Sequence, residues 1–142
     1  MVMYLRKITV HDFRNIADAA LEFSPKINCI SGNNGAGKTN LLDAVYYLSM
    51  TKSYFSTSDQ YVCRYGAEEA VVSGLYDMGD GFEERIGVSV RRNGKTVMRG
   101  GKAYERFSDH IGLLPIVMVS PSDSALINDS GDERRKYMNF IL

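Results

Sequence analysis

Residues Gly32 to Thr39 read GNNGAGKT. This stretch satisfies the pattern G-x-x-x-x-G-K-[ST] at every fixed position. An apolar segment precedes it at Lys26 to Ser31, where we expect a strand, and Lys38 to Met50 follows with the apolar spacing of a helix. Strand, glycine-rich loop and helix in this order predict a phosphate-binding loop, whereas an ordinary turn before a helix would not need this pattern.

The chemistry of such a loop follows from charge and space. Glycine lets the backbone approach a phosphate closely and adopt positive φ, and the N–H groups of the loop and of the helix N-terminus then face the anion. We expect Lys38 to reach the β- and γ-phosphates of ATP and the Thr39 hydroxyl to hold Mg²⁺. The predicted nucleotide-binding residues are Gly32, Asn33, Asn34, Gly35, Ala36, Gly37, Lys38 and Thr39.

Composition restricts the class of protein. The chain has 142 residues, 44% of them hydrophobic and 24% charged, which is typical of one globular domain. Its formal net charge is zero, so any contact with nucleic acid must come from a local patch. No apolar run approaches the length of a membrane span, and the first residues lack the design of a signal peptide. Without such a span or signal we expect no membrane partner. Because Cys29 and Cys63 lack CxxC spacing, we expect buried or free thiols in a reducing cytoplasm, and neither a disulfide nor a metal site.

Two strands are expected before the loop segment, at Met3 to His11 and at Ala17 to Phe23, followed by a turn at Ser24-Pro25. Small-molecule kinases and GTPases with this loop usually place it directly after their first strand. The two preceding strands therefore argue against those classes.

An antiparallel meander is expected after the helix. Its strands are predicted at Glu69 to Asp77, Glu83 to Arg92 and Lys95 to Arg99, with Asn93-Gly94 as a hairpin turn. The expected fold is therefore α/β, with a mixed sheet carrying the loop helix and the meander. Further elements are expected as short helices at Asp59 to Tyr65 and Tyr104 to Ile111, a buried strand at Leu113 to Val119, a helix cap within Ser120 to Asp123, and a helix at Asp132 to Leu142.

The sequence contains only part of the machinery for ATP hydrolysis. Hydrolysis also requires a carboxylate on the metal and a group that orients water. The late apolar run ends at Ser120, and Asp123 follows it; we interpret Asp123 as a helix cap, with metal ligation as the lesser alternative. We therefore expect no complete catalytic set in this chain.

Several segments together resemble the RecF family of bacterial DNA replication and repair ATPases, which belongs with the ABC-type heads of SMC proteins. Phe55 stands where many relatives have a basic residue, and Asn139 where the family usually has Asp. The segments that carry the resemblance are Phe13-Arg14-Asn15, GNNGAGKTNLLDAVYYL, Lys52-Ser53-Tyr54, His110 to Asp123 and Glu133 to Met138.

The resemblance implies that residues 1–142 are the first lobe of an ABC-type ATPase head (P-loop NTPase), truncated before the signature motif and the Walker B strand. It implies ATP and Mg²⁺ as cofactors, an ATP-dependent head-to-head homodimer, and binding to gapped or junction DNA. It also implies work with recombination mediator proteins in recombinase loading, DNA damage repair and the SOS response. The parent would be a weak DNA-stimulated ATPase and the fragment alone inactive. An SMC-like repair head, a small-molecule P-loop kinase and an interaction module with an empty loop remain as alternatives.

Two further sets of residues each have two alternative roles. Arg14 and Asn15 are candidates for residues that support the nucleotide-binding residues from behind. For Arg14, a surface salt bridge is an equal alternative. A basic run includes Arg91, Arg92, Lys95, Arg99 and Lys102, and such a run can follow a DNA backbone. A solvated protein face is the more common role of a charge run.

Overall fold

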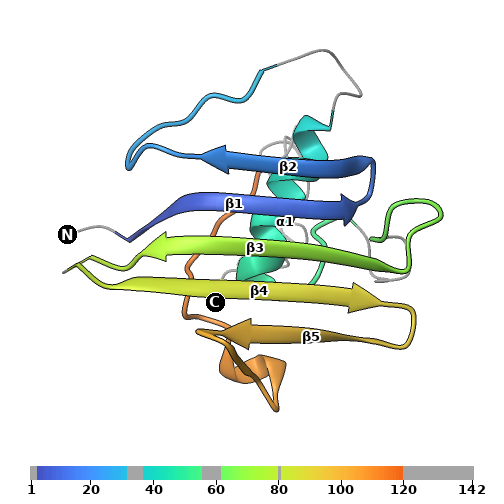
Figure 1. Cartoon of the computed structure of the whole chain (residues 1–142). Helices are drawn as coiled ribbons and strands as arrows, with labels where there is room; N and C mark the ends of the chain where they lie inside the picture. The colour runs from blue at the N-terminus through green and yellow to red at the C-terminus, as the bar shows by residue number, and fades with distance from the viewer. Residues whose placement is uncertain (1–2, 32–36, 56–61, 80, 120–142) are drawn as a thin grey trace, which may run out of the picture.

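The chain forms one antiparallel sheet with a helix against one of its faces. The computed structural model describes residues 3–31, 37–55, 62–79 and 81–119. The six strands lie in the order β2-β1-β3-β4-β5-β6 (Figure 1). The elements are β1 (Tyr4–Phe13), β2 (Ile16–Glu22), α1 (Lys38–Met50), β3 (Glu69–Asp77), β4 (Glu83–Arg91), β5 (Gly94–Arg99), β6 (Lys102–Ala103) and the 3-10 turn η2 (Phe107–Asp109).

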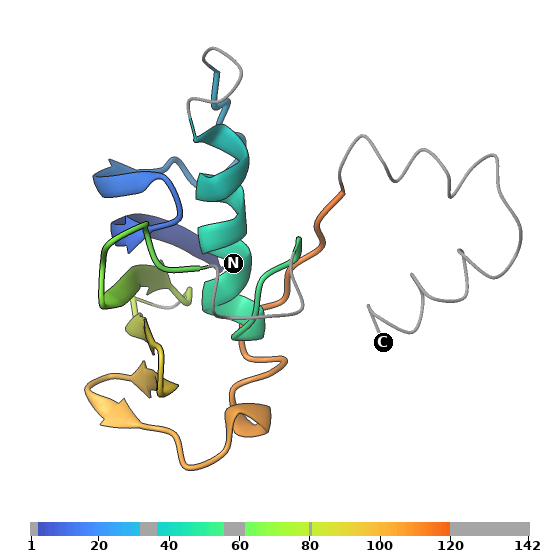
Figure 2. The ribbon, with the colours of Figure 1, turned by 90° about the vertical axis from the view of Figure 1, so that its right-hand side faces the viewer.

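The core lies between α1 and the sheet face that it covers, as the edge-on view of Figure 2 shows. Strand β3 alternates buried and partly exposed residues along its length, and β4 does the same from Ile86 to Val90. This period of two turns one set of side chains toward the helix. Within the described residues, no helix or strand covers the opposite face of the sheet.

Helix α1 has the bounds that the sequence predicts. Gly37 precedes it in the left-handed region, with φ of 91°. Thr51 ends it, also left-handed, and donates its N–H to the carbonyl of Tyr47 at 2.8 Å. Leu41 and Leu48, two of the predicted apolar positions, are buried against the sheet.

The expected α/β lobe is confirmed, and the meander occupies β3 to β5 almost as predicted. It is not a separate layer, because β3 also pairs with β1, so that one continuous sheet forms. Every strand pairing among the described residues is antiparallel. The parallel pairing that a mixed sheet implies therefore does not occur in this part of the chain.

The predicted strand at Lys26 to Ser31 is wrong, since none of these residues is in a strand. Ser24 instead closes a turn with Asn28, whose side-chain amide donates to the Ser24 carbonyl at 3.0 Å. Ile27 is 83% exposed. An apolar run becomes a strand only where a neighbour completes its hydrogen bonds, and no described strand lies beside this one.

The end of the described chain is also less regular than expected. Leu113 to Val119 forms no strand, and Val117 and Val119 are exposed. Within Tyr104 to Ile111, where a helix was expected, only the short turn η2 forms. This segment is instead positioned by the hydrogen bond between His110 and the Leu48 carbonyl of α1. Residues 62–65 are not helical, since Cys63 forms a β-bridge with Phe13. The elements expected at Ser120 to Asp123 and Asp132 to Leu142 lie outside the described residues.

Candidate nucleotide-binding site

The described part of the predicted phosphate loop is its junction with α1. Gly32, Asn33, Asn34, Gly35 and Ala36 lie outside the described residues. Gly37 has the positive φ that the pattern requires, and its carbonyl accepts the N–H of Leu41 at 2.8 Å, which starts the helix. Lys38 and Thr39 form the first turn, and Thr39 is exposed. Its hydroxyl is therefore accessible to a metal–nucleotide complex.

The turn between β1 and β2 packs against this junction. A Cβ atom added at Gly37 would lie 3.3 Å from Oδ1 of Asn15, closer than most such contacts. The same oxygen accepts a hydrogen bond of 2.6 Å from Nδ2 of Asn40. Asn15, a predicted neighbour of the nucleotide contacts, therefore lies directly at the end of the loop.

Arg14, the residue before it, is held by a buried carboxylate. Its Nη2 lies 3.1 Å from Oδ2 of Asp43 and donates to Oγ of Ser53 at 2.7 Å. The Arg14 side chain is 19% exposed and that of Asp43 is fully buried. Of the two alternatives for Arg14, the structure gives an ion pair, although the pair is internal and lies beside the loop helix.

A pocket of about 380 Å³ opens next to the loop junction. Residues 15–19, from the β1–β2 turn and β2, form one wall. Ile30 and Ser31, which lead into the loop, and the first residues of α1 form the rest. The pocket thus lies between the β1–β2 turn, the segment that leads into the loop and the start of α1.

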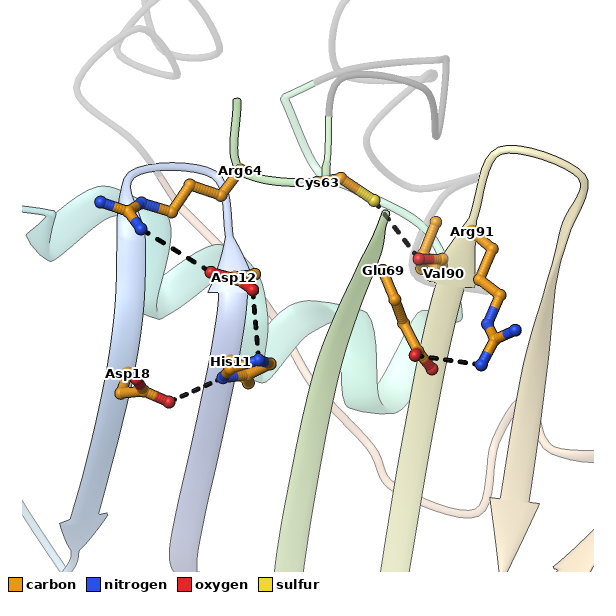
Figure 3. A network of polar contacts seen from close by, with 8 residues as sticks. All are labelled: His11, Asp12, Asp18, Cys63, Arg64, Glu69, Val90 and Arg91. Carbon is orange, nitrogen blue, oxygen red and sulfur yellow. Dashed lines mark hydrogen bonds and ion pairs between the residues drawn. The ribbon is translucent and has the colours of Figure 1, made fainter. Parts of the chain in front are cut away.

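A second polar cluster lies at the end of the sheet that carries the β1–β2 turn (Figure 3). His11 Nδ1 is 2.7 Å from Oδ1 of Asp18, and His11 Nε2 is 3.1 Å from Oδ2 of Asp12. Asp12 also pairs with Arg64 at 3.8 Å. The hydrogen bond that His11 makes to the Asp18 carboxylate, and then the charge of Asp12, raise the pKa of His11 above its ordinary value of 6.5.

The side chains of the predicted basic patch do not share one environment in the structure. Arg91 pairs with Glu69 at 3.1 Å (Figure 3), and Arg99 pairs with Glu84 at 2.8 Å. Lys95 points toward α1, where its ammonium donates to the carbonyl of Thr51 and lies 5.5 Å from the ring centroids of both Tyr47 and Phe107. Arg92 and Lys102 are exposed and make no ion pair with another described residue.

No sequence pattern predicted a role for Asp43 or His110, which are both fully buried. The available signal for Asp43 was a charged residue inside the otherwise apolar run of the loop helix. Burial of a charge requires partners, and these come from segments distant in the sequence. For His110 the sequence offered no signal, since its partner is a main-chain carbonyl.

Among the described residues, no group of three His, Cys, Asp or Glu side chains could hold a metal ion. Cys29 and Cys63 are free thiols, as predicted. No described helix has the length and apolar character needed to cross a membrane.

The family model described as RecF/RecN/SMC N terminal domain matches residues 4–121. The chain belongs to this family. It is 47% identical over 141 residues to the DNA replication and repair protein RecF of Parabacteroides distasonis, covering 99% of this chain and 38% of that protein. For RecF of Porphyromonas gingivalis the identity is 46% over 139 residues, with 96% and 38% covered. The chain thus spans 38% of the length of these relatives.

Solved structures agree with this family. A structure of the recombination mediator protein RecF with ATP, from the RecFOR pathway, matches with a TM-score of 0.84 and 33% identity. The match covers 96% of this chain and 38% of that one. A structure from work on ATP-driven dimerisation and DNA-stimulated activation of SMC ATPases matches with a TM-score of 0.77 and 20% identity, over 98% and 99% of the two chains. The second likeness concerns the fold, and the resemblance to RecF is confirmed.

Proposed function

We propose that this chain is the ATP-binding lobe of a RecF-type DNA replication and repair ATPase. The observation that carries the proposal is the junction at Gly37, where a left-handed glycine leads into the first turn of α1 with Lys38 and an exposed Thr39. The pocket beside this junction and the similarity to a RecF protein solved with ATP support it. The β1 and β2 strands before the loop argue against a small-molecule kinase.

Each residue of the site has a definite task in this proposal. Residues 32–37 and the N-terminus of α1 supply N–H groups to the phosphates, and Lys38 neutralises the β- and γ-phosphate charge. The Thr39 hydroxyl is a ligand for Mg²⁺, which would shield the charge of the triphosphate. Gly37 suits this cradle because a side chain there would press on Asn15.

The catalytic part of the site must come from elsewhere. The described residues offer no group of three His, Cys, Asp or Glu side chains that could hold a metal ion. We propose that the rest of a protein of RecF length, in an ATP-dependent head-to-head homodimer, completes the site. ATP-driven dimerisation of an SMC ATPase with a similar fold supports this arrangement. Recombination mediator proteins are the proposed protein partners, as the RecF relative's own description as a mediator suggests.

DNA is the proposed macromolecular ligand of the whole protein, with gapped or junction DNA as the preferred form. The RecF relatives are DNA replication and repair proteins. Arg92 and Lys102 are the members of the basic patch that are exposed and unpaired within the described part of the chain. They are therefore the residues through which this lobe would contact phosphates of the DNA backbone.

A calorimetric titration of the full-length gene product with MgATP tests the nucleotide site. We expect saturable binding that Lys38→Ala abolishes, while Lys26→Ala, which removes an exposed lysine before the loop, leaves the affinity unchanged. Binding that persists in Lys38→Ala would place the nucleotide elsewhere. Residues 1–142 alone should hydrolyse ATP negligibly. Steady turnover by this chain that Lys38→Ala removes would contradict the proposed division of the catalytic machinery.

A further inference from the structure

Asp43, in the second turn of α1, has all of its partners outside the helix. Its Oδ2 accepts from Oγ of Ser53 at 2.7 Å and lies 3.1 Å from Nη2 of Arg14. Its Oδ1 accepts the backbone N–H of Tyr54 at 2.8 Å. A fully buried carboxylate is costly unless charge and hydrogen bonds compensate it. Here the compensation comes from the end of β1 and from the segment that follows α1.

Arg14 depends on this carboxylate for its position. Its φ is 53°, a conformation that few residues other than glycine adopt without strain. The backbone N–H donates to the carbonyl of Val62 at 2.6 Å, and the guanidinium is bound through Nη2. Nε is buried with no hydrogen-bond partner among the described residues. The ion pair with Asp43 is therefore a principal anchor of this strained turn.

The β1–β2 turn links the Arg14–Asp43 ion pair to the junction between the phosphate loop and α1. Asn15 follows Arg14, accepts a hydrogen bond from Asn40, and lies so close to Gly37 that a Cβ atom there would be 3.3 Å from its Oδ1. Asn40 and Asp43 are three residues apart, and Asp43 is four residues after Thr39, so these residues share one side of the helix. The turn is thus fastened at two points along the side of α1 that carries Thr39.

We infer that Asp43 is a positioning residue for the nucleotide. Through Arg14 it holds Asn15 beside Gly37 and hydrogen-bonded to Asn40, and this placement keeps the loop–helix junction in the conformation that presents Lys38 and Thr39 to the phosphates. The inference rests on the proposed nucleotide function. It also gives Arg14 a role behind the site that does not require contact with the nucleotide.

Hydrogen exchange of the nucleotide-free, full-length protein tests the structural link. Asp43→Asn preserves size and leaves an oxygen for the Tyr54 N–H, but removes the charge that holds Arg14. We expect faster exchange at the Leu41 N–H, which bonds to the Gly37 carbonyl, and no change in β4, which lies away from the turn. Unchanged exchange at Leu41 would overturn the inference.

MgATP affinity tests the functional consequence, at a temperature well below the unfolding midpoint, so that lost stability alone does not change Kd. Asp43→Asn and Arg14→Gln should each raise Kd about tenfold or more, a size typical of groups that orient ligands from behind. The double variant should be no worse than either single one, because both remove the same pair. An unchanged Kd in both single variants would overturn the inference.

Asp77→Asn is the matched control. Its carboxylate also accepts a backbone N–H, from Gly79 at 2.9 Å, but it lies at the opposite end of β3 from the β1–β2 turn. This variant should lower thermal stability without changing Kd. If the wild-type protein fails to bind MgATP, the proposed nucleotide function is wrong, and exchange at Leu41 still decides whether Asp43 organises the junction.

Discussion

The ring of His110 is hydrogen-bonded to the carbonyl oxygen of Leu48, with Nε2 and that oxygen 2.6 Å apart. Leu48 lies in the last turn of α1, where carbonyls have no partner within the helix. The other ring nitrogen is 3.3 Å from the hydroxyl of Tyr104. One buried imidazole therefore fastens the segment after the meander to the C-terminal end of the phosphate-loop helix.

Replacing His110 with Ala should lower the free energy of unfolding by about 1–3 kcal/mol, because it leaves the Leu48 carbonyl buried without a donor. Denaturant unfolding of the full-length protein measures the change. His11→Ala is the control, since it removes a histidine that is 57% exposed. An unchanged free energy of unfolding in His110→Ala would show that the contact with Leu48 is not stabilising.

Gly74 of β3 lies beneath α1, and a Cβ atom there would be 2.7 Å from Cδ1 of Leu48. Gly74→Ala should therefore destabilise the protein by about 1–3 kcal/mol through overpacking. Gly87→Ala is the matched control, because a Cβ atom at that strand glycine meets nothing within 4 Å. Thermal unfolding should separate the two variants, and partial recovery of Gly74→Ala by Leu48→Val would identify the clash. Equal midpoints for the two alanine variants would contradict this packing.

The cluster around His11 predicts a dependence of stability on pH. The pKa of His11 is raised in the folded protein, first by Asp18 and then by Asp12. Its stabilising contribution is therefore complete below the ordinary pKa of 6.5 and disappears as pH rises through the folded-state pKa. The difference in unfolding free energy between wild type and His11→Gln should shrink across that interval. A difference that grows with pH would have the wrong sign, and Asp18→Asn should lower the pKa of His11 in an NMR titration.

The divided basic patch predicts unequal effects on DNA binding. Arg92→Ala and Lys102→Ala should weaken binding of gapped DNA, and each should reduce the slope of log K against log salt by about one. Lys95→Ala should leave DNA affinity unchanged while destabilising the fold, because that ammonium contacts the Thr51 carbonyl and two aromatic rings. Fluorescence anisotropy at several salt concentrations measures both effects. Lys95→Ala weakening DNA binding as strongly as Arg92→Ala would exclude this assignment.

Elements with local signals could be predicted from the order of residues alone. Gly37 before a helix with apolar residues at Leu41 and Leu48 gave the bounds of α1, and alternation with an Asn-Gly turn gave the meander. The phosphate-loop pattern likewise located the candidate nucleotide site, because its chemistry resides in consecutive residues.

Features that depend on contacts between distant segments could not be predicted in this way and became visible in the folded chain. Lys26 to Ser31 has a strand composition but no described neighbour to pair with, so composition alone misplaced a strand there. Lys95 belongs to a basic run in the sequence, yet its side chain turns toward α1. The role of Asp43 depends on its contacts with Arg14 and Ser53, which form only when the chain folds. A buried charge must find its partners in space, and the spacing along the chain does not specify them.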